Sequence, residues 1–371
     1  MIINLDLPTS VVFGRGRLGE LGRRTQPFGT SALLVCGRGA VRRHGILDGA
    51  LKSLADAGIT ATVFDAVLPE PTATEADLAV EAALRAGCDV IIGIGGGSAI
   101  DTAKAVAAGM RLGPVGPLVG RTLDRIPGPV PVVAVPTTAG SGAEMTRGAI
   151  LTDPRRGLKS GIRGDDLFPR LALVDPLLAR SVPAAVAADT AFDALAHAVE
   201  GYVARRSDDF TRWCAGRALE LLARRRDAIL RTPDDPATRD DLAFAALLGG
   251  IVVANASTCL PHRLQQAMGG LGVPISHGRG LAALYPVWLR HARPHAGERF
   301  AEIAARLGGG DVHDLVDRFR GAVGVTGGLR ASGIGDGHVD AILAAVSGNL
   351  DNDPIPEIDE GRLRAIVREA L

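Results

Sequence analysis

The sequence predicts an α/β N-terminal domain built on a parallel sheet, followed by an all-α C-terminal domain. Three observations lead to this prediction. Short apolar runs alternate with helical patterns over the first half of the chain, which is typical of a parallel sheet covered on both faces. Two of these runs end in loops rich in glycine and small hydroxyl residues. From about Ser181 onward, strand signals nearly vanish and apolar residues recur at helical spacing.

The elements of the first half follow from their composition. Strands are predicted where β-branched and other apolar residues are bounded by glycine, proline or polar residues, at residues 32–37 and 61–67. A third strand runs into glycines within residues 89–98, and residues 130–142 give a fourth strand followed by a loop. Helical patterns lie between them, at residues 46–58, 75–87 and 99–110.

Helices with broad apolar faces dominate the second half, and they are predicted at residues 182–204, 212–230, 239–257 and 360–371. Pro176 and Pro183 interrupt regular structure at the junction. A chain of 371 residues is long enough for two cores. We therefore predict two domains, residues 1–180 and residues 181–371.

The composition indicates a soluble, cytoplasmic protein. Lys+Arg and Asp+Glu balance at 41 each, so no basic field favours nucleic acid. The four cysteines are scattered without a CxxC pair, which fits reduced thiols. The N-terminus lacks a signal-peptide pattern, and no apolar run approaches the roughly 20 residues that span a bilayer. We expect no nucleic-acid and no membrane partner.

A glycine-rich loop, GIGGGSAIDTAK at residues 93–104, follows a predicted strand and opens a helix. Glycine lets the backbone approach a phosphate, and free N–H groups at a helix start favour an anion. Ser98 and Asp101 have the spacing of a capping box, so they are expected to fix the helix start. Any tight strand-to-helix turn favours glycine, and the GxGxxG spacing is absent. The second loop, VPTTAGSGAE at residues 135–144, makes a nucleotide crevice more probable than either loop alone.

Asp193 and His197 lie four residues apart in an alanine-rich helical run, so both side chains leave one helix face. His262 and His277 lie in two later segments. One carboxylate and three imidazoles form a plausible ligand set for a divalent transition metal. A lone histidine is more often an ordinary surface or core residue, and the remaining histidines are read that way.

Several motifs in order resemble the iron-containing (group III) alcohol dehydrogenase family: GGGSAIDTAK, PTTAGSGAE, DALAHAVE and PISHG. The resemblance covers nearly the whole chain. It implies a dinucleotide-binding α/β domain and an all-helical domain, in the dehydroquinate synthase-like architecture, with metal and substrate in the cleft between them. It also implies a homodimer.

The resemblance assigns roles to particular residues. It implies that one metal ion, Fe2+ or Zn2+, is held by Asp193, His197, His262 and His277. It implies that the dinucleotide pyrophosphate lies on Gly96, Gly97 and Ser98, with Asp101 at the same helix start. The nicotinamide side would be lined by Thr137, Thr138, Ser141 and Lys159.

Three departures from the family pattern affect the expected chemistry. A proton-relay histidine usually follows the third ligand by four residues, but Gln266 stands there, and an amide cannot exchange a proton as imidazole does. The gap between His262 and His277 is about one residue longer than usual. The aspartate that many NAD-preferring relatives carry after the first strand is replaced by Gly37, followed by Arg38. Removing that carboxylate favours a 2′-phosphate, so we expect NADP(H) over NAD(H), although Arg38 as a solvated loop residue stays the alternative.

The expected function is hydride transfer between NAD(P)H and a small aldehyde or alcohol. Phosphonoacetaldehyde reductase is one candidate, and its anionic substrate would use Arg147, Arg163 or Arg263, although each is more simply a surface arginine. Maleylacetate reductase is an alternative within the fold. A dehydroquinate synthase-like lyase or cyclase, which uses NAD without net redox, is another, and a non-catalytic binding protein is a third. Net NADPH consumption with a panel of aldehydes separates the reductases from the lyases and cyclases, and tight metal content argues against the binding protein.

Overall fold

The computed structural model describes residues 3–232 and 235–371, which form two compact units. The first, here called the sheet unit, comprises Leu7–Thr138 and Ala143–Val182. The second, the helical unit, comprises Pro183–Leu371, the tetrapeptide Ala139–Gly142 and residues at the N-terminus up to Asp6. The tetrapeptide thus lies among the strands in sequence but packs with the helices. A division into separate domains at residues 180 and 181 stays a prediction.

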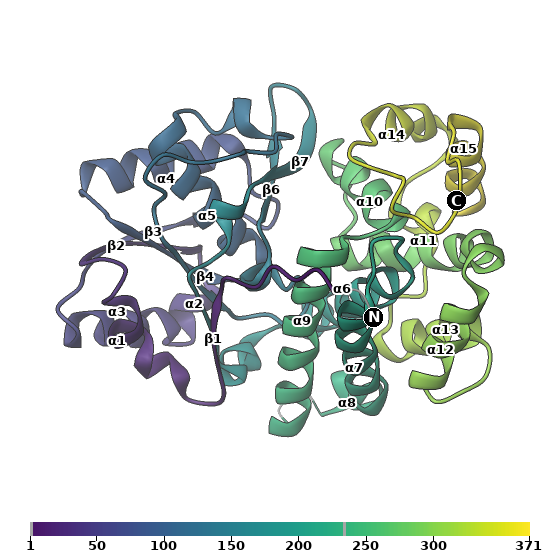
Figure 1. Ribbon diagram of the computed structural model, residues 1–371, viewed down its shortest axis with the longest axis horizontal. Helices are drawn as coiled ribbons and strands as arrows, with labels where there is room; N and C mark the ends of the chain where they lie inside the picture. The colour runs from purple at the N-terminus through teal and green to yellow at the C-terminus, as the bar shows by residue number, and fades with distance from the viewer. Residues whose placement is uncertain (1–2, 233–234) are drawn as a thin grey trace. The chain divides into compact units, whose positions relative to one another are not determined.

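The sheet unit is built on a six-stranded sheet of order β1-β8-β5-β4-β2-β3 (Figure 1). All neighbouring strands pair in parallel. The strands are β1 (Ser10–Phe13), β2 (Ser31–Gly37), β3 (Thr60–Val67), β4 (Val90–Gly95), β5 (Val132–Pro136) and β8 (Leu171–Val174). The four predicted strands correspond to β2 to β5 and are confirmed. β1 and β8 were not predicted because each has only four residues.

Helices cover both faces of this sheet. They are α1 (Leu21–Thr25), α2 (Ala40–Arg43), α3 (Ile46–Asp56), α4 (Ala73–Arg85) and α5 (Gly97–Leu112). Because successive strand residues point to opposite faces, Leu33 and Val35 of β2 enter a core with α4 and α5. Leu34 and Cys36 enter the opposite core with α3. The predicted α/β class with a parallel sheet is confirmed.

A second sheet, the antiparallel pair β6 (Gly148–Asp153) and β7 (Leu158–Arg163), was not predicted. Its polar residues hide the alternation of a half-buried strand. Side chains of α5 fix it in place. The Asp101 Oδ2 atom accepts from the Ile150 backbone N–H at 3.0 Å. The fully buried Lys104 donates from Nζ to the Gly148 carbonyl at 2.8 Å.

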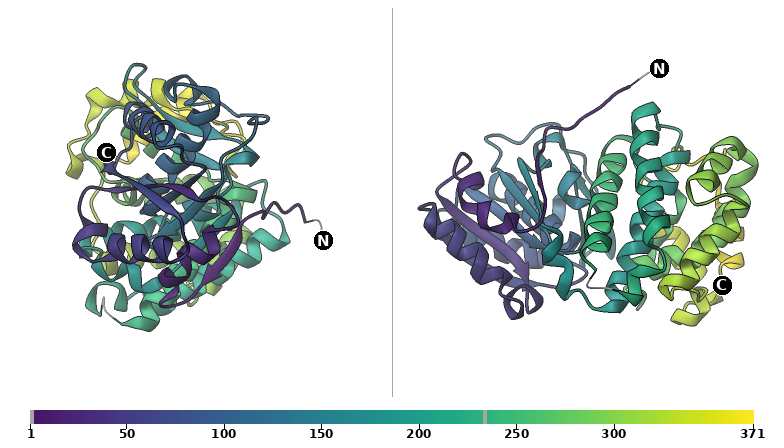
Figure 2. Two further views of the ribbon diagram at one scale, coloured as in Figure 1. Left: turned by 90° about the vertical axis from the view of Figure 1, so that its left-hand side faces the viewer. Right: turned by 90° about the horizontal axis from the view of Figure 1, so that it is seen from below.

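The helical unit contains long, closely packed helices, and α6, α7 and α9 contact one another (Figure 2). Close approach requires small residues: a Cβ on Gly201 of α6 would lie 2.0 Å from Val252 Cγ1 of α9. The predicted single helix over residues 212–230 is broken after Arg225. The helices are α6 (Ala184–Val203), α7 (Asp209–Arg225), α8 (Ala228–Arg231), α9 (Pro236–Ala256), α10 (Leu260–Gly270), α11 (His277–Ala292), α12 (Gly297–Arg306), α13 (Val312–Val323), α14 (Val339–Ala345) and α15 (Glu360–Glu369).

No single helix of the described ranges is long and apolar enough to cross a membrane. The pair α9 and α10, bent by 97°, would reach that length and apolarity only when taken together.

Candidate metal centre and dinucleotide loop

Three helices of the helical unit bring the four predicted metal ligands together. Asp193 and His197 lie one turn apart on α6, His262 lies near the start of α10, and His277 is the first residue of α11. The alanines between and beside the α6 pair leave that face open to the imidazoles from α10 and α11.

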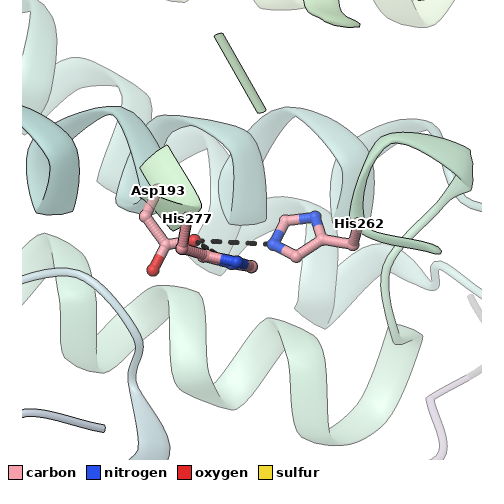
Figure 3. Close-up of side chains that lie close together, drawn as sticks. All are labelled: Asp193, His262 and His277. Carbon is pink, nitrogen blue, oxygen red and sulfur yellow. Dashed lines mark ion pairs between the residues drawn. The ribbon is translucent and has the colours of Figure 1, made fainter. Parts of the chain in front are cut away.

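The Nε2 atoms of the three imidazoles converge on one carboxylate oxygen. They lie 3.6, 3.5 and 3.4 Å from Asp193 Oδ1, for His197, His262 and His277 in turn. Figure 3 shows the His262 and His277 contacts. One possible ligand atom each from Asp193, His262 and His277 all lie within 4.8 Å of one another. The His197 ring stacks on the His262 ring, with centroids 4.6 Å apart.

The burial of the four residues and their unpartnered atoms indicate whether they suit a cation. Asp193, His197 and His262 are buried, whereas the His277 side chain is 33% exposed. Among the described residues, Asp193 Oδ1 and His262 Nε2 have no hydrogen-bond partner. A buried polar atom without a partner costs about 1–3 kcal/mol, and a cation between these two atoms would satisfy both. Nitrogen donors with one hard oxygen suit Zn2+ or Fe2+. The residues therefore fit the predicted divalent metal.

Each imidazole is held from behind through its other nitrogen. The Nδ1 atoms contact the Gly140 carbonyl at 3.3 Å, Glu200 Oε1 at 2.8 Å and Gln265 Oε1, for His197, His262 and His277 in turn. Since all three partners are acceptors, each Nδ1 donates its proton, and each Nε2 can present a lone pair once a metal has displaced any second ring proton. The three tautomers are thus fixed for metal binding.

These three supporting acceptors were not predicted from the sequence. Glu200 could have been predicted to support the site, because a carboxylate three residues after His197 in an apolar run requires a buried partner. The sequence indicates Gln265 less strongly, through its place three residues after His262. The Gly140 carbonyl could not have been predicted, since only tertiary structure brings a backbone oxygen to His197.

The pKa values of the ligands follow from burial and from their mutual charges. Burial lowers the pKa of His197 to about 4, so this ring is neutral. Burial also raises the pKa of Asp193, but the His197 and His277 imidazoles outweigh it and hold that pKa well below its usual value. Burial lowers the pKa of His262, yet Glu200 and Asp193 outweigh it and raise that pKa to about 9. Asp193 and Glu200 together provide two formal negative charges, which match a divalent cation.

Gln266, the residue in the place of the proton-relay histidine, is buried on α10, one turn after His262. Within residues 3–232 and 235–371 it forms no hydrogen bond to a ligand imidazole; its neighbour Gln265 makes that contact.

The glycine-rich loop joins β4 to α5 in the sheet unit. Gly95 has φ 154°, and a Cβ there would lie 2.7 Å from Ala99 Cβ, so the turn requires glycine. Gly96 is the N-cap of α5, and Gly97 is the first helical residue. The Thr137 N–H donates to the Gly95 carbonyl at 2.8 Å. A Cβ on Gly96 would lie 3.3 Å from Thr138 Oγ1. The structure therefore places Gly96, Gly97, Thr137 and Thr138 together at the ends of β4 and β5.

The predicted capping box is wrong. In the described chain, no side chain caps α5. Ser98 Oγ instead donates to the Pro69 carbonyl at 2.5 Å. Asp101 points inward, toward the Ile150 N–H and, at 3.7 Å, Lys104 Nζ. The buried lysine and the β6 backbone provide stronger partners for this carboxylate than the helix start does.

The remaining predicted cofactor residues belong to both units. Lys159 of β7 is buried and forms an ion pair with Glu70. Ser141 belongs to the tetrapeptide of the helical unit. Gly37 ends β2, and Arg38 is exposed directly after it.

The arginines near the end of β2 differ in their partners. Arg42 Nη2 lies 2.6 Å from Asp65 Oδ2, whereas Arg38 has no hydrogen bond or ion pair within the described part of the chain. Arg38 is therefore available to an added anion.

Comparison with known proteins matches both halves of the chain. A family model described as iron-containing alcohol dehydrogenase matches residues 8–176, and the model of the C-terminal region of that family matches residues 187–370. A 1,3-propanediol dehydrogenase of Klebsiella pneumoniae is 31% identical over 382 residues, covering 98% of each chain.

Solved structures also match the chain over nearly its full length. A crystal structure of 1,3-propanediol oxidoreductase matches with TM-score 0.93 at 29% identity, covering 100% of each chain. A sulfoacetaldehyde reductase from Bifidobacterium kashiwanohense, in complex with NAD+, matches with TM-score 0.89 at 25% identity, covering 99% of this chain and 98% of the other.

Proposed function

Because the chain belongs to the iron-containing alcohol dehydrogenase family and has its dehydroquinate synthase-like fold, we propose that it is an aldehyde reductase with a divalent metal and a preference for NADP(H). The family assigns it to the NAD(P)-dependent oxidoreductases. The observation that carries the proposal is the convergence of three imidazole Nε2 atoms on Asp193 Oδ1. We place this enzyme in the cytoplasm, as a homodimer.

In this proposal Asp193, His197, His262 and His277 hold the metal. A divalent ion bound there supplies Lewis acidity to the substrate oxygen, an effect worth several kcal/mol of the barrier, while the nicotinamide supplies the hydride. Glu200 and Gln265 keep the imidazoles oriented. Gln266, a neutral amide, does not itself exchange a proton, so the proton reaches the substrate oxygen through a water molecule that Gln266 orients or through the cofactor ribose.

The dinucleotide is proposed to bind the sheet unit through the loop after β4. Backbone N–H groups at Gly96, Gly97 and Ser98 face the pyrophosphate, because the first N–H groups of a helix have no partner within it. Asp101 acts indirectly, by fixing α5 to β6. Roles for Thr137, Thr138, Ser141 and Lys159 at the nicotinamide stay a proposal.

The preference for NADP(H) rests on the end of β2. Gly37 provides no carboxylate there, and Arg38 is exposed without a partner in the described residues. A guanidinium forms charge-assisted hydrogen bonds with a phosphate, so Arg38 is proposed to bind the ribose 2′-phosphate. The similar sulfoacetaldehyde reductase was crystallised with NAD+, which makes the cofactor preference the first property to measure.

For the substrate we propose a small aldehyde with an anionic group, such as phosphonoacetaldehyde. Support comes from the similarity to a sulfoacetaldehyde reductase, whose substrate is also an anionic aldehyde. Of the three predicted arginines, Arg147 is bound to Asp165 at 2.7 Å. Arg163 lies on β7 of the sheet unit. Arg263 follows His262 on α10 and is buried, and its Nε has no hydrogen-bond partner within the described ranges.

The test is a panel of aldehydes, with phosphonoacetaldehyde, sulfoacetaldehyde and maleylacetate among them, assayed with NADPH and NADH and with added Fe(II) or Zn(II). The proposal expects metal-dependent NADPH oxidation. The His277→Ala variant should lose this turnover and bind NADPH as the wild type does. Full activity of the His277→Ala variant, once it is shown to hold no metal, would refute the mechanism. Turnover with maleylacetate alone would identify the alternative reductase, and conversion of a substrate without net NADPH consumption would identify the lyase or cyclase alternative.

A further inference from the structure

We propose that Gln265 is a positioning residue, which fixes the tautomer and orientation of His277 for metal binding. This inference rests on the proposed metal function of the same site. Gln265 is fully buried on α10, and its Oε1 contacts His277 Nδ1. No motif in the sequence pointed to it.

His277 needs this support more than the other ligands do. Its side chain is 33% exposed, whereas those of His197 and His262 are 7% and 4% exposed. It is the first residue of α11, and the preceding residue, Ser276, forms no side-chain cap on α11 within the described chain. Packing therefore restrains the His277 ring less than the others. The contact at Nδ1 is what selects one of its two ring orientations.

The direction of the hydrogen bond follows from the metal geometry. His277 Nε2 faces Asp193 Oδ1 at 3.4 Å, so it must carry a lone pair to bind a cation there. The ring proton then lies on Nδ1, and Gln265 must present its oxygen, not its nitrogen. This orientation leaves Gln265 Nε2 buried without a partner among the described residues.

A buried amide nitrogen without a hydrogen-bond partner is destabilising, and leucine would fill about the same space without that penalty. Packing alone therefore does not explain a glutamine at this position, whereas its acceptor oxygen does. The space around it is also specific, because a Cβ on Gly280 of α11 would lie 2.9 Å from Gln265 Cγ.

The chemistry of the acceptor differs from that behind His262. Glu200 is a carboxylate and adds charge to the centre, whereas the Gln265 amide orients its imidazole without adding charge. Asp193 and Glu200 already supply the two negative charges that balance a divalent ion. A neutral acceptor behind the third imidazole preserves that balance.

The experiment measures Zn2+ affinity in the full-length, metal-free protein by competition with a chromophoric chelator, without any assay of turnover. Gln265→Leu removes the acceptor and should weaken Zn2+ binding about 10- to 100-fold. Gln265→Glu keeps an acceptor at the same reach and should restore affinity to within a few-fold of wild type or better. The melting temperature and NADPH binding of both variants should stay near the wild-type values.

Equal Zn2+ affinity in Gln265→Leu and wild type would overturn the inference while leaving the proposed function intact. A wild-type protein that binds no Zn2+ or Fe2+ would overturn both. The tautomer is tested without any variant: nitrogen-15 spectra of histidine-labelled wild-type protein should show His277 protonated at Nδ1. Protonation at Nε2 alone in the metal-free protein would refute the role of Gln265, even if the leucine variant fails to fold.

Discussion

Glu200 Oε1 accepts a hydrogen bond from His262 Nδ1 at 2.8 Å, at a point where the glutamate is fully buried. Its other oxygen accepts from the Cys259 N–H at 2.7 Å, and the Tyr285 hydroxyl donates to Oε1 at 3.2 Å. One carboxylate therefore fixes both the His262 ring and the backbone that leads into α10.

Replacing Glu200 should weaken the metal centre although Glu200 is not itself a ligand. In Glu200→Gln the charge behind His262 is lost, and we expect Zn2+ affinity to fall about 10- to 100-fold, as measured on the metal-free protein. Glu302→Gln is the matched control, because Glu302 accepts from the Tyr202 hydroxyl at 2.6 Å in the same unit. It should leave metal affinity unchanged. Equal losses in the two variants would mean that the effect is not specific to His262.

Gly278 should be intolerant of a side chain. It follows His277 on α11, and a Cβ there would lie 2.1 Å from the Asp189 carbonyl oxygen of α6. Gly278→Ala should move the start of α11 away from α6, so that His277 retreats from Asp193. We expect a loss of about 1–3 kcal/mol in unfolding free energy, with weaker metal binding.

The control for this effect is Gly297→Ala at the first residue of α12, where a Cβ would meet nothing within 4 Å. Denaturant unfolding and bound-metal analysis of both variants provide the measurement. Normal metal content in Gly278→Ala would show that the two helices have room to adjust.

Arg38 should determine the cofactor preference. Arg38→Ala removes a guanidinium from the end of β2, and a hydrogen bond to a charged group is worth about 1.5–3 kcal/mol. NADPH binding should therefore weaken about 10- to 100-fold, and NADH binding should change little. Arg42→Ala is the comparison, because Arg42 is already bound to Asp65, and its effect should be smaller. A parallel loss of both cofactors in Arg38→Ala would assign that arginine to general nucleotide binding.

Glu144 should make stability depend on pH. Burial raises its pKa to about 7, although Lys104 opposes the shift. Between the unfolded pKa, near 4.5, and pH 7, the folded state keeps a proton that the unfolded state releases. Stability therefore falls as pH rises through this window, by an amount on the order of 1–3 kcal/mol.

Glu144→Gln removes the titrating group, so its melting temperature should vary less between pH 5.5 and 8.5 than that of the wild type. Thermal scans at both pH values provide the test. Identical pH dependence in the two proteins would place the pH-sensitive group elsewhere.

Local patterns were sufficient to predict much of the fold. The runs that became β2 to β5 are apolar, five to eight residues long and bounded by turn residues, so composition identified them. β1 and β8 have only four residues each, and their strand state depends on pairing with each other in the sheet. The β6–β7 hairpin was missed because its stability comes from buried Asp101 and Lys104 on a distant helix.

The site divides in the same way. The spacing of Asp193 and His197 follows from helix geometry alone, whereas the roles of Glu200, Gln265 and the Gly140 carbonyl depend on which helices meet. The capping prediction for Ser98 and Asp101 failed because α5 begins at Gly97, so Ser98 lies inside the helix and not at its N-cap, and because buried Asp101 turns to the Ile150 N–H and Lys104. Local sequence thus identified groups able to bind a metal, and tertiary contacts select the groups that support them.

The tetrapeptide 139–142 has a consequence for protein engineering. Gly140 faces Thr190 of α6, and Gly142 faces Gly250 of α9, at distances that exclude a side chain. Gly140 also supplies the carbonyl behind His197. A fragment that begins at Pro183 would lack this tetrapeptide. A metal centre transplanted into another scaffold must therefore carry four residues from the other half of the chain.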